Sequence, residues 1–269
     1  MHLLKSNMTS FQILSDLHAE TGNEYSMKDI NEIKPTTDII VLAGDIGSFY
    51  HPESILECLR IAARKFKHVL YVPGNHEYYY PLNSNVPKAN MNDLLFRFKK
   101  KVSADEELNN VEILDRRIVR INGVMFAGTT LWTDPRPLKD IPDFVRLDID
   151  IRKYESLHTR DVRWLDRVAS SLNTDEPLVV VTHHAPLKSC LKESHFIKRY
   201  SSLYTTNLER TRIFKKAKVW VFGHTHNNMD VVVGTTRVVS NQVGKEKDDC
   251  SADVEQVIRA DSYEIGKAD

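Results

Sequence analysis

Six of the 11 histidines in this chain occur in four short motifs, two of which also contain carboxylate or amide side chains. The motifs are Asp16-Leu17-His18, Gly74-Asn75-His76-Glu77, Thr182-His183-His184-Ala185-Pro186 and Gly223-His224-Thr225-His226, and Gly44-Asp45 adds a further carboxylate. Imidazole and carboxylate ligands together suit zinc, manganese or iron, whereas calcium and magnesium sites are built almost entirely from oxygen. The residue types therefore predict a site for divalent transition metals.

The number of donors is sufficient for a pair of ions. With His76, Glu77 and one of the two adjacent histidines His183 and His184 set aside, the motifs supply four imidazoles, two carboxylates and one amide. A carboxylate shared between two dications would hold them about 3.5–4 Å apart, the separation typical of phosphatases and nucleases. Two dications, less two carboxylates and one hydroxide, leave a net positive site. Such a site favours an anionic ester as the substrate.

Each motif follows a short apolar run rich in β-branched residues, which we interpret as a buried strand. The runs are Phe11–Leu14, Ile39–Ala43, Val69–Val72, Leu178–Val181 and Val219–Phe222. In open α/β sheets, sites form in the crevice beyond the carboxyl ends of the strands. We therefore expect the motifs to converge at that edge.

The segments between the strands predict a mixed α/β fold. Apolar residues at helical spacing predict helices over Ser54–Phe66 and Ser156–Leu172. The first of these helices joins two strands, which favours a parallel pair. Pro135–Arg152 and Lys188–Thr206 lack clean periodicity, so both are predicted to be long loops. The second loop is basic, with Lys188, Lys192, His195, Lys198 and Arg199 against Glu193, and either binds a further phosphate or is simply a solvated charged loop.

Two hairpins are also expected, which adds antiparallel strands to a partly parallel sheet. They cover Ile118–Ala127, with the turn at Asn122-Gly123, and Met229–Val239, with the turn near Gly234. No linker or repeat divides the chain, so we expect one domain over residues 1–269, with a tail at 245–269 whose fold the sequence does not indicate.

Composition narrows the classes of protein further. The chain has 269 residues, 41% of them hydrophobic, and equal numbers of basic and acidic side chains, so no global charge attracts it to nucleic acid or an anionic membrane. Its three cysteines form no C-x-x-C pair, which favours a reducing compartment over a disulfide framework. No apolar run approaches the roughly 20 residues of a membrane helix. We expect a cytoplasmic protein with no membrane partner and no obligatory protein partner.

The ordered set of motifs resembles the calcineurin-like metallophosphoesterase superfamily over residues 11–241. Gly128–Asp134 together with Thr182–Pro186 is similar to uncharacterised bacterial metallophosphoesterases. The resemblance implies a four-layer αββα sandwich with two mixed β-sheets and a dinuclear metal centre at the strand ends. It implies one metal held by Asp16, His18, Asp45 and His226, and another held by Asp45, Asn75, His183 and His224, with Asp45 as the bridge.

The resemblance also implies roles for residues near the metals. The family places a proline two or three residues after its ligand histidine, so we choose His183 as the ligand and expect His184 to line the site. Attack by a metal-bound hydroxide is expected, because two metals lower the pKa of a bound water toward about 7 and clamp the phosphoryl oxygens. Asp45 and His76 are the expected catalytic residues, with His76 protonating the leaving oxygen or stabilising its charge. Tyr78 and Tyr79 either line the substrate site or pack as ordinary side chains.

The expected class of ester follows from an arginine that is missing after the Gly44-Asp45 motif. Ser/Thr protein phosphatases of this superfamily carry Gly-Asp-x-Val-Asp-Arg-Gly, but this chain reads Gly44-Asp45-Ile46-Gly47-Ser48 and lacks the phosphate-binding arginine. We therefore expect a phosphodiesterase that acts on a small-molecule or nucleotide substrate. The alternatives are a DNA or RNA nuclease or a phosphomonoesterase, and a protein-binding scaffold without activity is a further reading.

Overall fold

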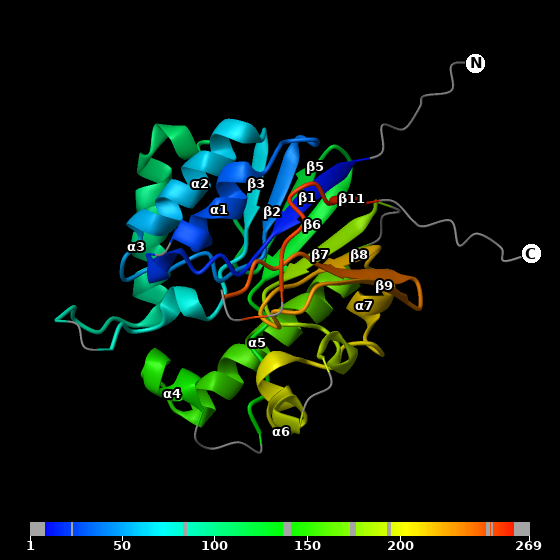
Figure 1. The fold of residues 1–269 in the computed structure, drawn as a ribbon. Coiled ribbons are helices and arrows are strands. Elements are labelled where there is room, and N and C mark those ends of the chain that lie inside the picture. Colours follow the sequence, from blue (N-terminus) through cyan, green and yellow to red (C-terminus); the bar gives the residue numbers. More distant parts are fainter. Residues whose placement is uncertain are drawn as a thin grey trace, which may run out of the picture.

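Two mixed β-sheets that pack against each other form the centre of the protein (Figure 1). The computed structural model describes residues 9–22, 24–82, 85–136, 141–172, 176–192, 195–245, 248 and 250–260. Within these residues, helices cover the outer face of each sheet. The α/β architecture expected from the resemblance is therefore present.

The first sheet has the strand order β11-β1-β2-β3-β4. Its strands are β1 (Ser10–Leu14), β2 (Ile39–Leu42), β3 (His68–Tyr71), β4 (Val111–Ile113) and β11 (Val257–Arg259). β1 to β4 run parallel, and β11 pairs antiparallel with β1, with Phe11 opposite Ile258. The described part of the C-terminal tail therefore adds a strand to the first sheet, next to the N-terminal strand β1.

The second sheet has the strand order β5-β6-β7-β8-β10-β9. Its strands are β5 (Arg117–Ile121), β6 (Val124–Thr129), β7 (Leu178–Thr182), β8 (Val219–Val221), β9 (Met229–Val233) and β10 (Thr236–Ser240). The central strands are parallel, and the two predicted hairpins provide the antiparallel edges. Asn122 and Gly123 have φ values of 50° and 78°, the positive values that a type I′ turn requires.

The core lies in three layers, and alternate residues of one strand enter different layers. Ile39 and Val41 of β2 pack between the two sheets, whereas Ile40 and Leu42 pack under the helices of the first sheet. Because both faces of these strands are buried, their sequences are continuous apolar runs rather than alternating ones. This burial explains why the five central strands could be predicted.

The helices divide between the two sheets. α1 (Glu24–Glu32), α2 (Glu53–Lys65) and α3 (Met91–Ala104) belong to the layer of the first sheet, and α7 (Arg212–Lys216) belongs to that of the second. α5 (Ile151–Ser171) contributes its N-terminal part to the first layer and its C-terminal part to the second. The predicted helices are confirmed as α2 and α5. α5 begins earlier than predicted, because the Asp150 side chain accepts a hydrogen bond from the Lys153 backbone nitrogen at 2.8 Å and caps the helix there.

The prediction of two long loops was wrong. Residues 135–152 contain α4 (Pro142–Leu147), and residues 188–206 contain a 3₁₀ turn (Lys188–Cys190) and α6 (His195–Tyr204). A helix of six residues is less than two turns long, so α4 is too short to display a helical period. The end of α6 is fixed by tertiary contact, since Ala185 forms backbone hydrogen bonds with both Tyr204 and Thr206.

The structure tests two further expectations only in part: the basic character of residues 188–206 and the absence of a membrane-spanning helix. Of the basic residues expected between 188 and 206, the side chains of His195, Lys198 and Arg199, and the acidic Glu193, lie outside the described residues. Among the helices that the structure describes, none combines the length and the apolar character that crossing a bilayer requires.

The contact between the sheets can be tested at Phe126. This β6 side chain is fully buried, and its ring packs edge-on against that of Phe11 in β1, with 5.5 Å between centroids. We expect Phe126→Ala to lower the free energy of unfolding by about 3–5 kcal/mol, because the substitution leaves a cavity between the sheets. Phe96, on α3, is 59% exposed, so Phe96→Ala should change it by less than about 0.5 kcal/mol. Urea denaturation measures both, and similar values for the two variants would contradict the inter-sheet core.

Candidate metal centre

The five motifs meet at one edge of the fold, beyond the carboxyl ends of strands from both sheets. Asp16 and His18 follow β1, Asp45 follows β2, and Asn75 and His76 follow β3 in the first sheet. In the second sheet, His183 follows β7, and the His224-Thr225-His226 segment follows β8. The predicted convergence is therefore seen in the structure.

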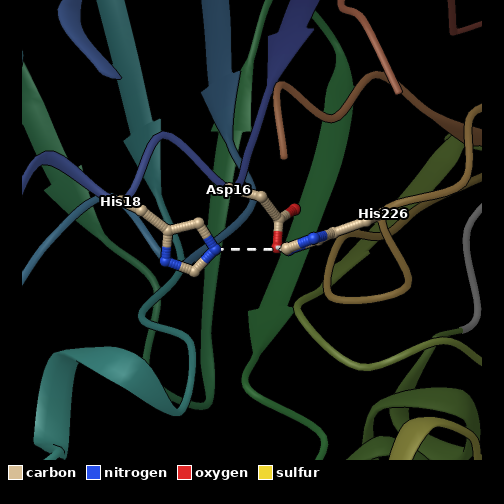
Figure 2. Close-up of side chains that lie close together, drawn as sticks. All are labelled: Asp16, His18 and His226. Carbon is tan, nitrogen blue, oxygen red and sulfur yellow. Dashed lines mark hydrogen bonds and ion pairs between the residues drawn. The ribbon is translucent and has the colours of Figure 1, made fainter. Parts of the chain in front are cut away.

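One cluster consists of Asp16, His18 and His226 (Figure 2). One donor atom from each side chain lies within 4.8 Å of the others. The Nε2 atoms of His18 and His226 are 3.2 Å apart, and His226 Nε2 is 3.4 Å from Asp16 Oδ1. Two imidazole lone pairs at that distance repel each other unless a proton or a cation lies between them. The donor set thus fits a divalent ion.

A second cluster consists of Asp45, His183 and His224, again with donor atoms within 4.8 Å. His183 Nε2 is 3.2 Å from Asp45 Oδ1 and 3.0 Å from Asn75 Oδ1. Its other nitrogen, Nδ1, donates to the Ala43 carbonyl oxygen at 2.9 Å, which orients the ring with Nε2 toward the cluster. All seven predicted ligands are thus brought together.

The side chain of His184 points away from Asp45 and Asn75, which His183 contacts. Its Nδ1 lies 3.2 Å from the Thr130 carbonyl oxygen, and its ring packs 4.3 Å from that of His224. Within the described part of the chain, His184 Nε2 is buried without a hydrogen-bond partner. The geometry therefore favours His183 over His184 as the ligand, and places His184 behind His224.

The backbone at these residues adopts an uncommon conformation. Five of the predicted ligands have positive φ: 57° at Asp16, 49° at His18, 53° at Asp45, 69° at His224 and 45° at His226. Left-handed conformations are uncommon for residues other than glycine, although Asp and His tolerate them better than most, and they cluster at functional sites. Hydrogen bonds between the loops hold this geometry, because the backbone nitrogens of Asp16 and His18 donate to the carbonyl oxygens of Gly44 and Asp45, each at 2.9 Å.

Two glycines make space for the carboxylates. A Cβ atom on Gly74 would lie 2.2 Å from Asp45 Oδ1, and one on Gly223 would lie 2.7 Å from Asp16 Oδ2. Both glycines belong to motifs singled out in the sequence. In the structure they allow the backbone to approach the predicted ligands closely.

Burial and neighbouring charges shift the pKa values of the site residues, and the direction of the shift differs from residue to residue. Burial would lower the pKa of His183, but the Asp45 carboxylate outweighs it and raises the value to about 9. Burial also opposes ionisation of Asp45, yet the neighbouring histidines, chiefly His183, hold its pKa well below the usual range. For His184, burial and the charge of His183 act together and lower the pKa to about 3. The carboxylates are thus ionised and available as ligands.

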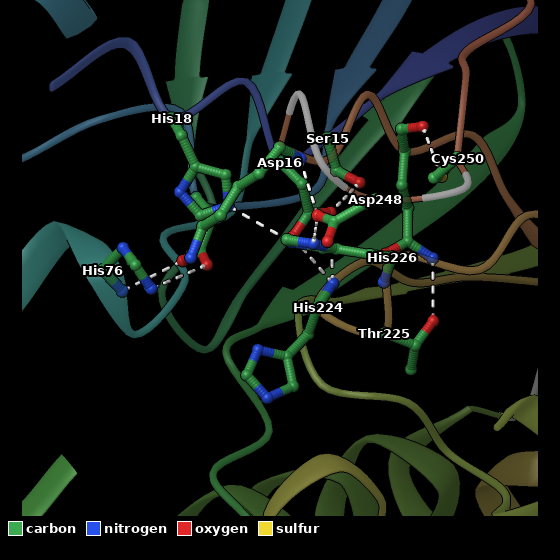
Figure 3. A network of polar contacts seen from close by, with 12 residues as sticks. Ser15, Asp16, His18, His76, His224, Thr225, His226, Asp248 and Cys250 are labelled. Carbon is green, nitrogen blue, oxygen red and sulfur yellow. Dashed lines mark hydrogen bonds and ion pairs between the residues drawn. The ribbon is translucent and has the colours of Figure 1, made fainter. Parts of the chain in front are cut away.

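Two carboxylates that support the histidines were not predicted. Glu20 Oε1 lies 3.3 Å from His18 Nδ1 and 3.1 Å from His76 Nδ1. Although burial opposes it, these two hydrogen bonds lower the pKa of Glu20 to about 2. Asp248, from the C-terminal tail, contacts His226 Nδ1 by a short hydrogen bond (Figure 3). Carboxylates in such positions orient histidine ligands and increase their basicity.

Asn75 has its own support. Its amide nitrogen lies 2.8 Å from the Tyr79 hydroxyl oxygen and 3.4 Å from Asp143 Oδ1 on α4, which leaves its amide oxygen toward His183. Tyr79 therefore positions a predicted ligand. Tyr78 is 5% exposed and packs against the rings of Phe49 and Trp132, so it has little surface to offer a substrate.

Comparisons with known proteins identify the family and the fold of this chain. Residues 10–228 match the sequence profile described as calcineurin-like phosphoesterase. The chain is 27% identical over 267 residues to an uncharacterized protein of Acanthamoeba polyphaga mimivirus, with 88% of this chain and 91% of that protein covered. The crystal structure of phosphopantetheinyl hydrolase from Mycobacterium tuberculosis is similar, with a TM-score of 0.68, 19% identity, and 89% of this chain and 90% of that chain covered. At that identity the likeness shows a shared fold.

The support from the tail can be tested at Asp248. We expect Asp248→Ala to weaken metal binding by about 10–100-fold, because loss of a carboxylate behind a histidine ligand typically has that effect. The matched control is Asp253→Ala, which removes the same charge from the same tail at a residue whose side chain accepts from the Glu255 backbone nitrogen. Titration of metal against a chelator of known affinity measures both. Unchanged affinity in Asp248→Ala would mean that the tail does not support the site.

Proposed function

The chain belongs to the calcineurin-like phosphoesterase family, and we propose that it is a metal-dependent phosphodiesterase acting on small molecules or nucleotides. In this proposal two transition-metal ions, manganese, iron or zinc, bind at the strand ends. One is held by Asp16, His18, Asp45 and His226, and the other by Asp45, Asn75, His183 and His224. The mixed imidazole and carboxylate donor set of the two clusters supports this choice of metals.

The metals and the protein have separate tasks. When bound, divalent ions supply a nucleophilic hydroxide at neutral pH and neutralise charge on the phosphoryl oxygens. The chain itself holds a proton at His76. Glu20 accepts from His76 Nδ1, so Nε2, which is 4.0 Å from Asp45 Oδ2, is the nitrogen that would donate a proton to a leaving oxygen. Burial would lower the pKa of His76, but Asp45 and Glu20 raise it, so the protonated form needed by a general acid is favoured.

The observation that carries the preference for diesters is the turn after β2. When Gly44-Asp45 is set against the protein-phosphatase motif, Phe49 stands where that motif has its arginine. Phe49 is 6% exposed and stacks on Phe98 of α3, with 4.5 Å between ring centroids. The turn is therefore anchored in the hydrophobic core and supplies no cation. A monoester dianion carries more charge than a diester monoanion, so the lack of this cation disfavours monoesters more.

A substrate comparison tests this function. For manganese-loaded protein, we expect kcat/KM for an aryl phosphodiester to equal or exceed that for the matched monoester, with phosphoserine peptides turned over poorly. Asp45→Asn is the inactive control, because it weakens a ligand that both metals share in this proposal. A large preference for phosphoserine peptides would contradict the diesterase, and absence of turnover on every ester would favour a scaffold.

The role of His76 can be separated from metal binding by the leaving group. An alkoxide gains much from protonation in the transition state, whereas nitrophenolate departs readily without it. We expect His76→Ala to reduce kcat about 10²–10⁴-fold for alkyl esters and much less for nitrophenyl esters, with metal content unchanged.

Glu20→Gln should have a smaller effect in the same direction, because the introduced amide would keep a hydrogen-bonding oxygen near His76 but lose the charge. Rates on both ester series and metal analysis give the answer. Equal losses for good and poor leaving groups would indicate electrostatic stabilisation instead, and loss of metal would make His76 a structural residue.

A further inference from the structure

A groove of about 510 Å³ runs along the outer face of α5, away from the predicted ligands. Its lining includes Arg152, Ser156, Thr159, Arg160, Arg163 and Arg167. These residues recur at intervals of three, four or one, so they share one face of the helix. From Arg152 to Arg167 the helix rises roughly 22 Å. The opposite face packs on the second sheet through Leu165 and Val168.

The groove has an excess of positive charge that the described part of the protein does not neutralise. Among the described residues that line it, only Glu155 is acidic, and Glu155 already pairs with Arg136 at 3.2 Å. Arg152, Arg163 and Arg167 are exposed, and none of them has an ion-pair partner among the described residues. The chain as a whole has zero net charge, so this concentration of arginines is local.

Arg160 connects the groove to a second one. Its Nε atom is buried and has no hydrogen-bond partner in the described part of the chain, and the nearest carboxylate oxygen, Asp161 Oδ1, is 3.8 Å away and bonded to Arg116 at 3.1 Å. Arg160 also lines a neighbouring groove of about 430 Å³, to which Lys153 and Asn92 contribute. Arg160 therefore borders both grooves, and Lys153 adds a further basic side chain of α5 to the second one.

We propose that this arginine groove binds the phosphodiester backbone of a nucleic acid. Arginine, serine and threonine side chains are typical donors to phosphate oxygens, and they make up the described lining apart from Glu155. That lining includes no aromatic side chain on which a base could stack and no apolar side chain that could anchor a peptide. Contact through phosphates without base recognition matches this composition better than binding of an acidic peptide.

The proposal does not rest on the proposed hydrolysis. None of the lining residues is a predicted metal ligand, so binding can be measured with a chelator present and turnover switched off. Turnover of a small aryl phosphodiester then serves as a separate readout. Failure of binding and failure of catalysis are thereby distinguished.

The test uses fluorescence anisotropy with a labelled 20-nucleotide single-stranded DNA over a range of salt concentrations. We expect the triple variant Arg152→Gln, Arg163→Gln, Arg167→Gln to bind at least about 10-fold more weakly at low salt. The slope of log affinity against log salt should become shallower by about 2, because each lost phosphate contact on a single strand removes about 0.7. Glutamine has nearly the helix propensity of arginine, so α5 should remain folded.

The matched control is the triple variant Arg64→Gln, Arg117→Gln, Arg120→Gln. These exposed arginines lie on α2 and β5, and each pairs with a glutamate, so the control removes the same net charge from other surfaces. It should bind the DNA as the unmodified protein does. Both triple variants should keep the turnover of the aryl ester.

Three results would overturn the proposal. One is absence of DNA binding by the unmodified protein at low salt, and another is an equal loss of affinity in the two triple variants. The third is displacement of the DNA by poly-glutamate at the same charge concentration at which competitor DNA displaces it, which would assign the groove to acidic peptides. Should the α5 triple variant unfold, the single variant Arg167→Gln is expected to reduce the salt slope by about 0.7 and decides the question alone.

Discussion

Two buried carboxylates at the ends of neighbouring parallel strands impose the constraint on which the rest of this structure depends. Asp16 and Asp45 follow β1 and β2 and are 0% and 1% exposed. An ionised carboxylate without partners is too costly to bury, so positive or hydrogen-bonding groups must face both. The second sheet supplies them, because His226 lies against Asp16 and His183 against Asp45. Charge compensation therefore ties the carboxyl ends of the two sheets together where the inter-sheet apolar core ends.

The loops that present these groups are held by hydrogen bonds rather than by packing alone. Glu77 is fully buried, and its carboxyl oxygens accept from the backbone nitrogens of Ile46 and Gly74 at 2.7 and 2.8 Å. It accepts as well from the backbone nitrogen of Asp45 and from the Tyr71 hydroxyl. One side chain thus joins the loops after β2 and β3, and helps to maintain the left-handed backbone at Asp45.

The sequence predicted the parts of the fold whose burial leaves a local pattern. Strands such as β2 and β7 are buried on both faces, and the motifs at their ends contain residue types that are rarely grouped by chance. Asp143 and Asp248 left no such pattern, because single carboxylates are common and their partners Asn75 and His226 are 68 and 22 residues away along the chain. Glu20 lies only two residues from His18, but its other partner, His76, is 56 residues away, so the sequence does not indicate that it joins the two histidines. α4 is too short for a period, and β11 is defined only by its pairing with β1. The assignment of each ligand to one metal remains a prediction.

The spread of the site along the chain determines when the site can form during biosynthesis. His18 and His226, which lie side by side in the folded protein, are 208 residues apart. Translation proceeds at about 5–20 residues per second, so roughly 10–40 s pass between synthesis of the first of these residues and the last. Until His183 has been made, Asp45 lacks the partner that the second sheet supplies, and Asp16 lacks its partner until His226 has been made. Completion of the site therefore requires that the chain has been made at least as far as His226 and that the two sheets have come together.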